Sequence, residues 1–597
     1  MIKDPVSLEF LFWGSLASLL LSYGAEFLFL IIGLISILRQ KMQTRSSPLP
    51  DSEYPSISII VPCYNEEKTI HRTISFLKKI DYPNFNTIFV NDGSSDHTLQ
   101  TISAELPLIT FLSHSEKGLP TRPVRSIYTT RDGSFFVVDK ENGGKADALN
   151  AGINVSQADL ICCVDADTII KTDGLKRMAA RFHRDPRVVA AGGNVRVKNG
   201  SERDPRFPHR IRAPRRMITR LQAMEYIRSI NISRNALAAF NANLIISGAF
   251  GLFKTGVIRE IGGYEKFSRG EDIELLTRIH LHLKESKTPY RVVQSYFSDA
   301  FTDAPETRRE LKSQRKRWQL GLVSTLRGHL IDFLRHPLSP ITFFTLPYLV
   351  AFEILLPLVQ LVSYLAIPVL LILKVIPPAY LWALLLVLGL SILVNILFLV
   401  LDFSFHSYYR FRDQLRIIFS SLVEPLYYHQ LNCYWKLLGL VASFRNIFVR
   451  SAWVPPRGNK DYRSMIGGDP ASGELSRARN LRVIPDYRSF SGERIIILYL
   501  EGAFDPGDAG RFEELIQYFQ TKNRHRFILD LTGLKDLSSE ALSILLTTGT
   551  RLRNRGGGVV LVNTPRKIHR ILKISNAVKE IKCCPDYLSA TRKIKYE

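Results

Sequence analysis

Hydrophobic positions follow two different patterns along this 597-residue chain. Short apolar runs separated by amphipathic stretches occupy most of the chain, whereas three long apolar segments stand at residues 8–38, 341–375 and 378–402. A short apolar run bounded by turn-forming residues indicates a buried strand, and an amphipathic stretch indicates a helix. Each long segment has the length that a membrane-spanning helix needs.

The first short runs predict a parallel sheet. Residues 56–62 and 87–90 are strand-like, and residues 68–80 between them are helix-like. This strand–helix–strand order is typical of a βαβ unit, in which ligands bind at the carboxyl ends of the strands. Tyr64, Glu66 and Asp92 come at those ends.

A third apolar run, residues 160–164, ends in Asp165-Ala166-Asp167, and Gly143-Gly144-Lys145 precedes it at the start of a helix-like stretch. Glycines let a backbone approach phosphate, and a helix N-terminus favours an anion. Two carboxylates there could hold a divalent cation together with substrate phosphates. A D-x-D sequence alone is a weak signal, because carboxylates are common in loops. Its combination with the other acidic loop and the glycines predicts a nucleotide-sugar site.

The sequence Gly270-Glu271-Asp272 opens another helix-like run. Transfer of a sugar needs a base for the acceptor hydroxyl, and Asp272 is the candidate, with Glu271 in a supporting role. The alternative is that both acids cap a helix and stabilise its first turn, which is compatible with a catalytic role. A single base without a covalent carboxylate partner favours one in-line displacement that inverts the anomeric carbon.

Residues 314–318 precede the second long apolar segment. Gln314 and Arg317 could bind the acceptor or the donor diphosphate, whose charge Lys145, Arg317 or both would neutralise together with a metal. Trp318 could stack on a sugar, or it could be an aromatic anchor at the membrane surface.

The charge distribution predicts membrane topology. The chain has 79 Lys and Arg against 55 Asp and Glu, a net charge of +24. Basic flanks at residues 39–45 and 404–416 should be cytoplasmic, which places the N-terminus outside and makes the protein multi-pass. Residues 417–449 have basic flanks on both sides, which favours an interfacial or re-entrant hairpin or two short crossings over one span. Glu26 within the first span could be a pairing site or could face neighbouring helices.

The basic excess also suits nucleic acid, but no nucleic-acid-binding motif is present, so nucleic acid is not an expected partner. The arginine-rich residues 196–220 could be a solvated loop, a contact with anionic lipids, or a site for an anionic polymer or diphosphate. The six cysteines show neither metal-site nor disulfide spacing, which indicates reduced thiols in a cytosolic compartment.

The final part of the chain predicts a separate small α/β domain. Strand-like runs alternate with helix-like stretches there: residues 494–500, 508–520, 527–531, 539–554, 559–562 and 565–575.

The motifs together resemble those of processive family 2 glycosyltransferases, the group of cellulose, hyaluronan, chitin and poly-N-acetylglucosamine synthases. They run in chain order through residues 62–66, 91–94, 143–146, 165–167, 247–250, 270–272 and 314–318. The resemblance implies a GT-A-like nucleotide-sugar domain embedded between transmembrane helices in the bacterial inner membrane, and a polymer channel formed by those helices. Two stretches, residues 113–139 and 198–220, are predicted to be insertions, and no c-di-GMP-binding PilZ module is visible.

Carried over by motif, the resemblance assigns each candidate residue a role. It implies that Tyr64, Glu66 and Asp92 hold the uridine of a UDP-sugar, Lys145 the diphosphate, Asp165 the nucleotide, and Asp167 the Mg²⁺ or Mn²⁺ ion. Asp272 would be the base, and Gln314, Arg317 and Trp318 would bind donor diphosphate and acceptor.

The tail resembles a STAS domain, the fold of anti-sigma-factor antagonists, through residues 528–534 and 561–563. That family usually has Asp-Ser-Ser-Gly where this chain has Ser538-Ser539-Glu540-Ala541, with Glu540 in the phosphoserine position. We hypothesise that the switch is lost or locked and that the domain docks a protein partner; stoichiometric phosphate on Ser538 or Ser539 in phosphopeptide mapping would contradict this. Alternatively, Glu540 is simply an acid in a helix's first turn.

These observations predict five regions: residues 1–45 (membrane helix and basic flank), 46–335 (cytoplasmic transferase domain), 336–457 (membrane and interfacial helices), 458–491 (linker) and 492–597 (STAS-like domain). The favoured function is a synthase that polymerises a sugar and extrudes the polysaccharide. The alternatives are a non-processive transferase acting on a lipid-linked acceptor, and a membrane-tethered signalling protein with a decayed transferase.

Overall fold

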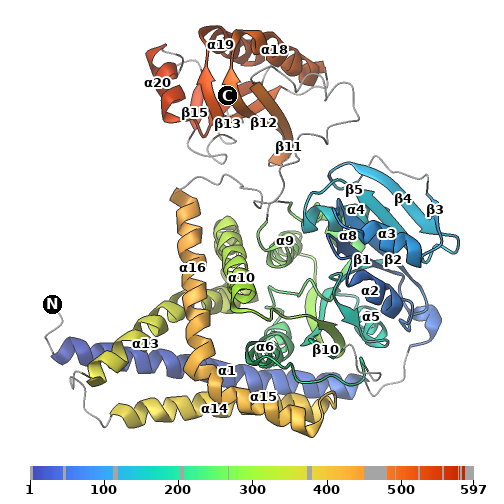
Figure 1. Cartoon of the computed structure of the whole chain (residues 1–597), viewed down its shortest axis with the longest axis vertical. Helices are drawn as coiled ribbons and strands as arrows, with labels where there is room; N and C mark the ends of the chain where they lie inside the picture. The colour runs from blue at the N-terminus through green and yellow to red at the C-terminus, as the bar shows by residue number, and fades with distance from the viewer. Residues whose placement is uncertain are drawn as a thin grey trace. The chain divides into compact units, whose positions relative to one another are not determined.

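The structure is a computed structural model that describes residues 5–44, 49–111, 118–201, 207–266, 268–372, 380–448, 481–490, 493–521, 525–553, 557–575, 577, 581–584 and 590. The chain forms two compact units, Met1–Ser443 and Phe444–Glu597, and each is described by itself (Figure 1).

A ten-stranded mixed sheet organises the first unit. Its strand order is β3-β4-β5-β2-β1-β6-β9-β8-β10-β7. The strands are β1 Ile57–Cys63, β2 Phe85–Asp92, β3 Leu108–Thr110, β4 Val124–Thr130, β5 Phe135–Lys140, β6 Leu160–Cys163, β7 Ile169–Ile170, β8 Val188–Val197, β9 Gly251–Lys254 and β10 Arg291–Thr302. Strand β1 pairs in parallel with both β2 and β6, so the predicted acidic loops leave the same edge of the sheet. The α/β class predicted from the sequence is therefore confirmed.

Helices cover both faces of this sheet (Figure 1). Alternating residues of β1 point to opposite faces, as a pleated strand requires. Ile57, Ile59 and Val61 join a core with α2 (Ile70–Leu77), α3 (Thr98–Glu105) and α5 (Gly174–Arg184), whereas Ile60 joins a core with α4 (Lys145–Val155), α8 (Thr255–Glu260) and α9 (Glu271–Glu285).

The stretch predicted to be an insertion, residues 113–139, contributes β4 and β5 to the sheet, where β5 pairs in parallel with β2. The motif at residues 247–250 is not a strand, because β9 begins only at Gly251 and the preceding loop carries Gly248 towards α9.

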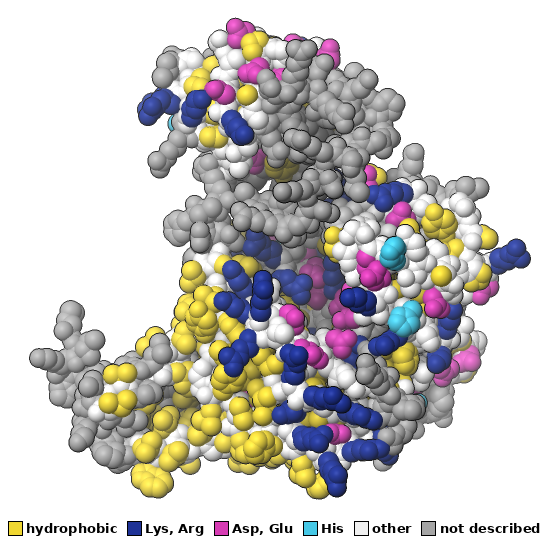
Figure 2. All heavy atoms as spheres, in the orientation of Figure 1, with side chains coloured by type: hydrophobic (Ala, Val, Ile, Leu, Met, Phe, Trp, Pro, Cys, Tyr) yellow, Lys and Arg dark blue, Asp and Glu magenta, His cyan; other side chains and the backbone are white. Residues whose placement is uncertain are grey.

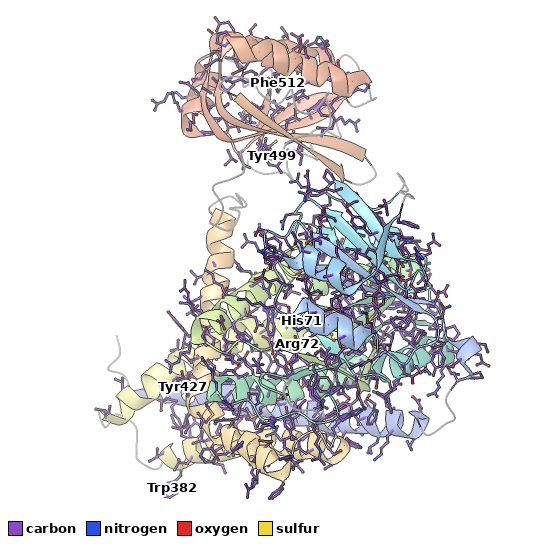
Figure 3. The ribbon with its side chains drawn as sticks, turned by 45° about the vertical axis from the view of Figure 1, so that its right-hand side comes forward. His71, Arg72, Trp382, Tyr427, Tyr499 and Phe512 are labelled. Carbon is purple, nitrogen blue, oxygen red and sulfur yellow. The ribbon has the colours of Figure 1, made fainter. Side chains whose placement is uncertain are left out.

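Among the described residues, three helices are long and apolar enough to cross a membrane: residues 12–43 of α1 (Pro5–Thr44), residues 341–364, and residues 381–405 of α14 (Tyr380–Phe405). The middle span combines η3 (Ile341–Thr345), α12 (Leu346–Tyr348), η4 (Leu349–Leu355) and the start of α13 (Leu356–Ile372). Figure 2 shows hydrophobic side chains gathered over the part of this unit where these helices lie. Trp382, which is 75% exposed, projects from the start of α14 (Figure 3).

After α14 the chain forms α15 (Phe411–Val423), a π-helical turn η5 (Glu424–Tyr428) and α16 (His429–Phe448). The stretch predicted as a hairpin or two short crossings is thus two helices joined through the π-helical turn. Exposed apolar residues recur along one stripe of the first helix and the turn: Phe411, Leu415, Phe419, Leu422 and Leu426.

A buried ionic network joins α14 to the sheet. Arg196 on β8 donates to Asp299 on β10 at 2.7 Å and to both carboxylate oxygens of Asp402 on α14 at 2.8 and 3.0 Å. All three side chains are at most 1% exposed. Buried charges need such pairing, so this network fixes a candidate membrane helix against two strands of the sheet.

The second unit is a five-stranded sheet of order β11-β12-β13-β14-β15. Its elements are β11 Leu481–Phe490, β12 Glu493–Phe504, α18 Pro506–Thr521, β13 Arg526–Leu537, α19 Ser539–Arg553, β14 Gly558–Val562, α20 Arg566–Ile574 and β15 Lys582–Cys584. Strands β12, β13 and β14 are parallel, and the helices pack on the sheet through a buried apolar core of their own.

Candidate active site

Asp92 at the end of β2 holds the glycine-rich turn. Its carboxylate accepts hydrogen bonds from the backbone N–H groups of Gly143 (2.9 Å) and Gly144 (2.8 Å) and from Lys140 Nζ (2.6 Å). Gly144 has a φ of +87°, a conformation that glycine adopts without strain. Asp92 is only 3% exposed, and its carboxylate already accepts three hydrogen bonds. It therefore fixes the backbone of the turn that leads into α4.

The turn places Lys145 at the centre of the site. Lys145 Nζ lies 2.6 Å from Asp165 Oδ1 and 3.4 Å from Glu271 Oε1. Asp165, Asp272 and Glu271 together hold the pKa of Lys145 above its ordinary value despite the burial that opposes them. The structure therefore joins the glycine turn, the D-x-D loop and the start of α9 around one ammonium group.

Asp272 also lies near that ammonium group. Its Oδ2 accepts a hydrogen bond from the backbone N–H of Gly248 at 2.9 Å. A Cβ added to Gly248 would come within 2.7 Å of Lys145 Nζ and 2.9 Å of Asp272 Oδ1, so both groups line the same small space. Burial raises the pKa of Asp272 to about 7, with Lys145 opposing the rise. A carboxyl with such a pKa can accept a proton at neutral pH.

Asp167, like Asp165, is partly buried. Its Oδ1 accepts hydrogen bonds from Thr168 Oγ1 (3.3 Å) and from Thr302 Oγ1 (3.2 Å) at the end of β10. Burial, with Asp165 nearby, raises the pKa of Asp167 to about 6. No cluster of three His, Cys, Asp or Glu side chains that could hold a metal ion occurs among the described residues. Mg²⁺ usually takes one or two carboxylates and completes its shell with water and substrate phosphates, so Asp165 and Asp167 fit that pattern.

Tyr64 and Glu66 follow β1 as predicted. Tyr64 is 53% exposed. Glu66 accepts a hydrogen bond from Thr69 Oγ1 at 2.5 Å, and burial raises its pKa, with Asp165 contributing to the rise. Asn65, which lies between them, donates its backbone N–H to Ser94 Oγ and accepts a hydrogen bond from the backbone N–H of Ser95, and these bonds fix the loop. Glu66 thus lies on the acidic side of the site with Asp165 and Asp167.

Gln314, Arg317 and Trp318 lie on α10 (Arg308–Gly328), which a Thr307–Glu310 capping box begins. Gly321 on this helix touches Gly270, because a Cβ on Gly321 would meet Gly270 Cα at 2.9 Å. Trp318 and Gly321 are three residues apart and share a helix face, so this contact brings Trp318 towards the start of α9. Trp318 is 42% exposed, Arg317 is exposed, and Gln314 Oε1 is buried without a hydrogen-bond partner in the described chain.

Three further residues were not predicted for the site. Lys198 Nζ lies 2.6 Å from Asp303 Oδ2, and both influence the pKa of Asp167. Arg234 on α7 (Arg234–Ala239) interacts electrostatically with Asp272, and burial lowers its pKa to about 10. Its Nη1 is buried without a hydrogen-bond partner in the part of the chain that the structure describes. Only the pairing of distant strands and helices brings these side chains here, so no local motif could have indicated them.

In the second unit, the predicted regulatory residues start α19. Ser538 Oγ accepts a hydrogen bond from the backbone N–H of Ala541 at 3.2 Å, and Ser539 Oγ donates to Glu540 Oε2 at 3.1 Å. Ser539 and Glu540 are exposed. The geometry is that of a capped helix with an acid in its first turn, a place that its dipole favours.

Each of the two units matches a known protein family. Residues 58–262 match the model of glycosyl transferase family 2, and residues 491–590 match that of the STAS domain. The poly-beta-1,6-N-acetyl-D-glucosamine synthase of Staphylococcus aureus (strain COL) is 31% identical over 271 residues, 45% of this chain and 55% of that protein. The enzyme of the same name from Staphylococcus epidermidis is 30% identical over 266 residues, 44% of this chain and 54% of that protein. The chain thus spans about half the length of these curated relatives.

Solved structures with lower similarity include the mannosyltransferase PcManGT from Pyrobaculum calidifontis in complex with GDP-Man and Mn²⁺. It is 18% identical, with a TM-score of 0.42 over 69% of this chain and 99% of that one. Staphylococcus aureus TarS 1-349 in complex with UDP-GlcNAc is 16% identical, with a TM-score of 0.32 over 62% of this chain and 91% of that one.

The sheet, the acidic loops at its edge and the match over residues 58–262 make the first unit similar to family 2 glycosyl transferases. The second unit is similar to STAS domains over residues 491–590, and both similarities are those that the motifs predicted.

Proposed function

We propose that this protein is a membrane-embedded, inverting glycosyltransferase that polymerises N-acetylglucosamine from UDP-N-acetylglucosamine and extrudes the polysaccharide. The observation that supports this most is the convergence on Lys145 of Asp165 from the D-x-D loop and of Glu271 from the start of α9, with Asp272 beside it. One compact site thereby supplies a cation for a leaving diphosphate and a base for an attacking hydroxyl. The choice of sugar rests on the names of the curated relatives.

The proposed reaction is a single displacement. Asp272 accepts the proton of the acceptor hydroxyl while the hydroxyl oxygen forms a bond to the anomeric carbon of the donor. The bond between that carbon and the diphosphate oxygen breaks, and its electron pair leaves with UDP. Lys145 neutralises the developing negative charge on the diphosphate, and its ion pair with Asp165 holds it in place before the donor binds.

The donor would occupy the edge of the sheet formed by the ends of β1, β2 and β6. In this proposal Tyr64, Glu66 and Asp92 hold the uridine, and Asp165 contacts the nucleotide. Asp167, with Asp165 beside it, would hold Mg²⁺ or Mn²⁺, which when bound adds positive charge against the diphosphate. Gln314, Arg317 and Trp318 would bind the diphosphate and the acceptor.

Polar side chains connect the candidate membrane helices to the helices packed against them, and the proposed extrusion requires such a fixed arrangement. Glu26 on α1 lies 3.4 Å from Arg228 on η2 (Ile227–Ser233), and Arg228 also donates to Asn395 on α14 at 2.9 Å. His429 on α16 lies within hydrogen-bonding distance of Gln360 on α13 at 2.9 Å. Polar groups among membrane helices line substrate paths or pair with one another, and these groups pair with one another, which fixes the helices within the first unit.

The test uses membranes that contain the full chain, supplied with a panel of UDP-sugars and Mg²⁺ or Mn²⁺. We expect a high-molecular-weight product from UDP-N-acetylglucosamine alone. A product with one added sugar on a lipid would replace the processive proposal with the non-processive one, and no transfer from any UDP-sugar would refute both.

The Asp272→Asn substitution tests the assigned base. We expect it to lower kcat by roughly 10²–10⁴-fold, the usual contribution of a general base, with little change in the affinity for the donor. Initial rates and equilibrium binding of the UDP-sugar would measure the two effects. Retained activity in this variant would refute the assignment.

We further propose that the transferase and STAS domains are cytoplasmic, within the five regions predicted from the sequence, and that the STAS domain docks a protein partner. Its helix α20 carries an exposed basic face formed by Lys567, His569, Arg570 and Lys573. Crosslinking from α20 in cells, compared with a chain in which these four residues are glutamine, would test this. A crosslinking pattern that does not change would count against a partner at that face.

A further inference from the structure

A buried arginine lies inside the Gln314–Trp318 motif but is not one of the motif residues with a predicted role. Arg315 is 7% exposed, and its guanidinium donates to both carboxylate oxygens of Glu225 at 2.6 and 2.7 Å. Glu225 lies on α6 (Met217–Tyr226), about ninety residues earlier in the chain. Two parallel charge-assisted hydrogen bonds fix both the position and the rotation of a guanidinium.

Tyr428, the last residue of η5, completes this group. Its hydroxyl donates to Glu225 Oε2 at 2.6 Å and lies 3.3 Å from Arg315 Nη2. We call Glu225, Arg315 and Tyr428 the Arg315 clamp. It joins α6 and α10 to the turn between α15 and α16; the neighbouring Tyr427 marks that turn in Figure 3.

The clamp also determines the surroundings of Trp318. The guanidinium carbon of Arg315 lies 4.6 Å from the centroid of the Trp318 ring, a cation–π contact. A guanidinium fixed by Glu225 cannot rotate away, so it orients the indole. Trp318 is nevertheless 42% exposed, which leaves ring surface available to a ligand.

We propose that the Arg315 clamp positions Trp318 as a platform for the apolar face of the acceptor sugar. This rests on the proposed function, because it assumes a sugar acceptor beside Asp272. The acceptor is favoured over the donor because Gly321, on the same helix face as Trp318, touches Gly270 directly before Glu271 and Asp272. Glu225, Arg315 and Tyr428 are positioning residues in this proposal, since they act through Trp318.

The experiment compares the full chain with Arg315→Lys, Glu225→Gln and Tyr428→Phe. Arg315→Lys keeps the charge but loses the paired hydrogen bonds. Tyr428→Phe removes the hydroxyl that donates to Glu225 and accepts from Arg315 but leaves the Arg315–Glu225 ion pair intact. Lys312→Gln is the matched control, because Lys312 is exposed on the same helix. Rates are measured against UDP-N-acetylglucosamine and against a β-1,6-linked N-acetylglucosamine tetrasaccharide. The emission of Trp318, taken as the difference from Trp318→Phe, reports on the indole without catalysis.

We expect Arg315→Lys and Glu225→Gln to raise the KM for the tetrasaccharide roughly tenfold or more. The KM for the donor should stay within about twofold of wild type, because a misplaced Trp318 would weaken binding of the acceptor before that of the donor. Tyr428→Phe should have a smaller effect in the same direction. In the wild type the tetrasaccharide should change Trp318 emission, and Arg315→Lys should weaken that response. Lys312→Gln should behave as wild type.

An unchanged tetrasaccharide KM, or proportional losses for donor and acceptor, would overturn the proposal and leave a purely structural ion pair. If the wild type transfers no sugar from UDP-N-acetylglucosamine, the proposed function fails instead. The emission measurement then still decides on the clamp, because a Trp318 signal that the tetrasaccharide does not alter refutes it.

Discussion

Asp272 and Lys145 stabilise each other's charged form. Burial opposes ionisation of the carboxyl, and the neighbouring ammonium group favours it. The balance leaves the pKa of Asp272 at about 7, compared with 3.8 for an ordinary aspartate. A base of this kind is strong enough to take a proton from a hydroxyl in the transition state and is still partly ionised at neutral pH.

This pKa predicts the pH dependence of the reaction. A base acts only when it is deprotonated, so activity should fall as the pH decreases through about 7, rather than through the range near 4 of an ordinary aspartate. The measurement is kcat/KM for the donor between pH 5 and pH 9 (roughly the range that brackets such a group). Activity that stays constant from pH 9 down to pH 5 (roughly the same range) would show that Asp272 is not the titrating base.

Gly248 lies against the side chains of both Lys145 and Asp272. In Gly248→Ala the new methyl group would meet Lys145 Nζ at 2.7 Å and Asp272 Oδ1 at 2.9 Å. Both atoms are ends of side chains that can move, so the fold should survive. Because displacements near 1 Å cost about 10²-fold, we expect a loss of activity of that order.

Gly256→Ala provides the control for this substitution. Gly256 lies in α8, and an added Cβ would have no atom within 4 Å. We expect unchanged activity and a stability equal to or up to about 1 kcal/mol above wild type, since alanine favours helix. Thermal unfolding and initial rates of both variants would measure the difference; equal losses of activity would contradict the explanation.

At the scale of elements, the glycine turn depends on Asp92. Asp92→Ala would remove the acceptor of two backbone N–H groups and one of the two carboxylates that pair with Lys140, which is fully buried. Removing one partner of a buried ion pair typically costs about 3–5 kcal/mol. Chemical denaturation of the purified protein would measure this cost. A loss of donor binding at unchanged stability would instead mean that the carboxylate of Asp92 acts only on the nucleotide.

The same elements show what the sequence could reveal. Strands β1 and β6 were predictable because their apolar runs are bounded by polar loops, and the family motifs indicated that Lys145, Asp165 and Asp272 belong to one site. Strand β8 was not recognised although all of its residues are buried, because it contains Gly192, Gly193 and Arg196. Arg196 is acceptable there only because Asp299 and Asp402 pair with it. Because these two partners lie more than a hundred residues away in the sequence, the residues around Arg196 show no hydrophobic pattern that would predict a strand.

At the scale of the whole molecule, the two compact units have separate cores. We therefore expect residues 480–597 to fold alone and to unfold cooperatively in urea, as single domains of this size usually do. Circular dichroism and tryptophan-independent probes such as amide exchange would follow the transition. A non-cooperative transition would show that the STAS domain needs the rest of the chain for its stability.

The ionic network between β8 and α14 has a consequence for biosynthesis. Arg196 donates to Asp402, which emerges from the ribosome 206 residues later. At translation rates of about 5–20 residues per second, Asp402 is synthesised on the order of 10–40 s after β8. The first unit therefore cannot complete its buried interior until α14 has been synthesised, so the folding of the sheet depends on a helix that follows it by about two hundred residues. A chain truncated before Asp402 would keep Asp299 but lose the other of the two carboxylates that pair with the buried guanidinium of Arg196.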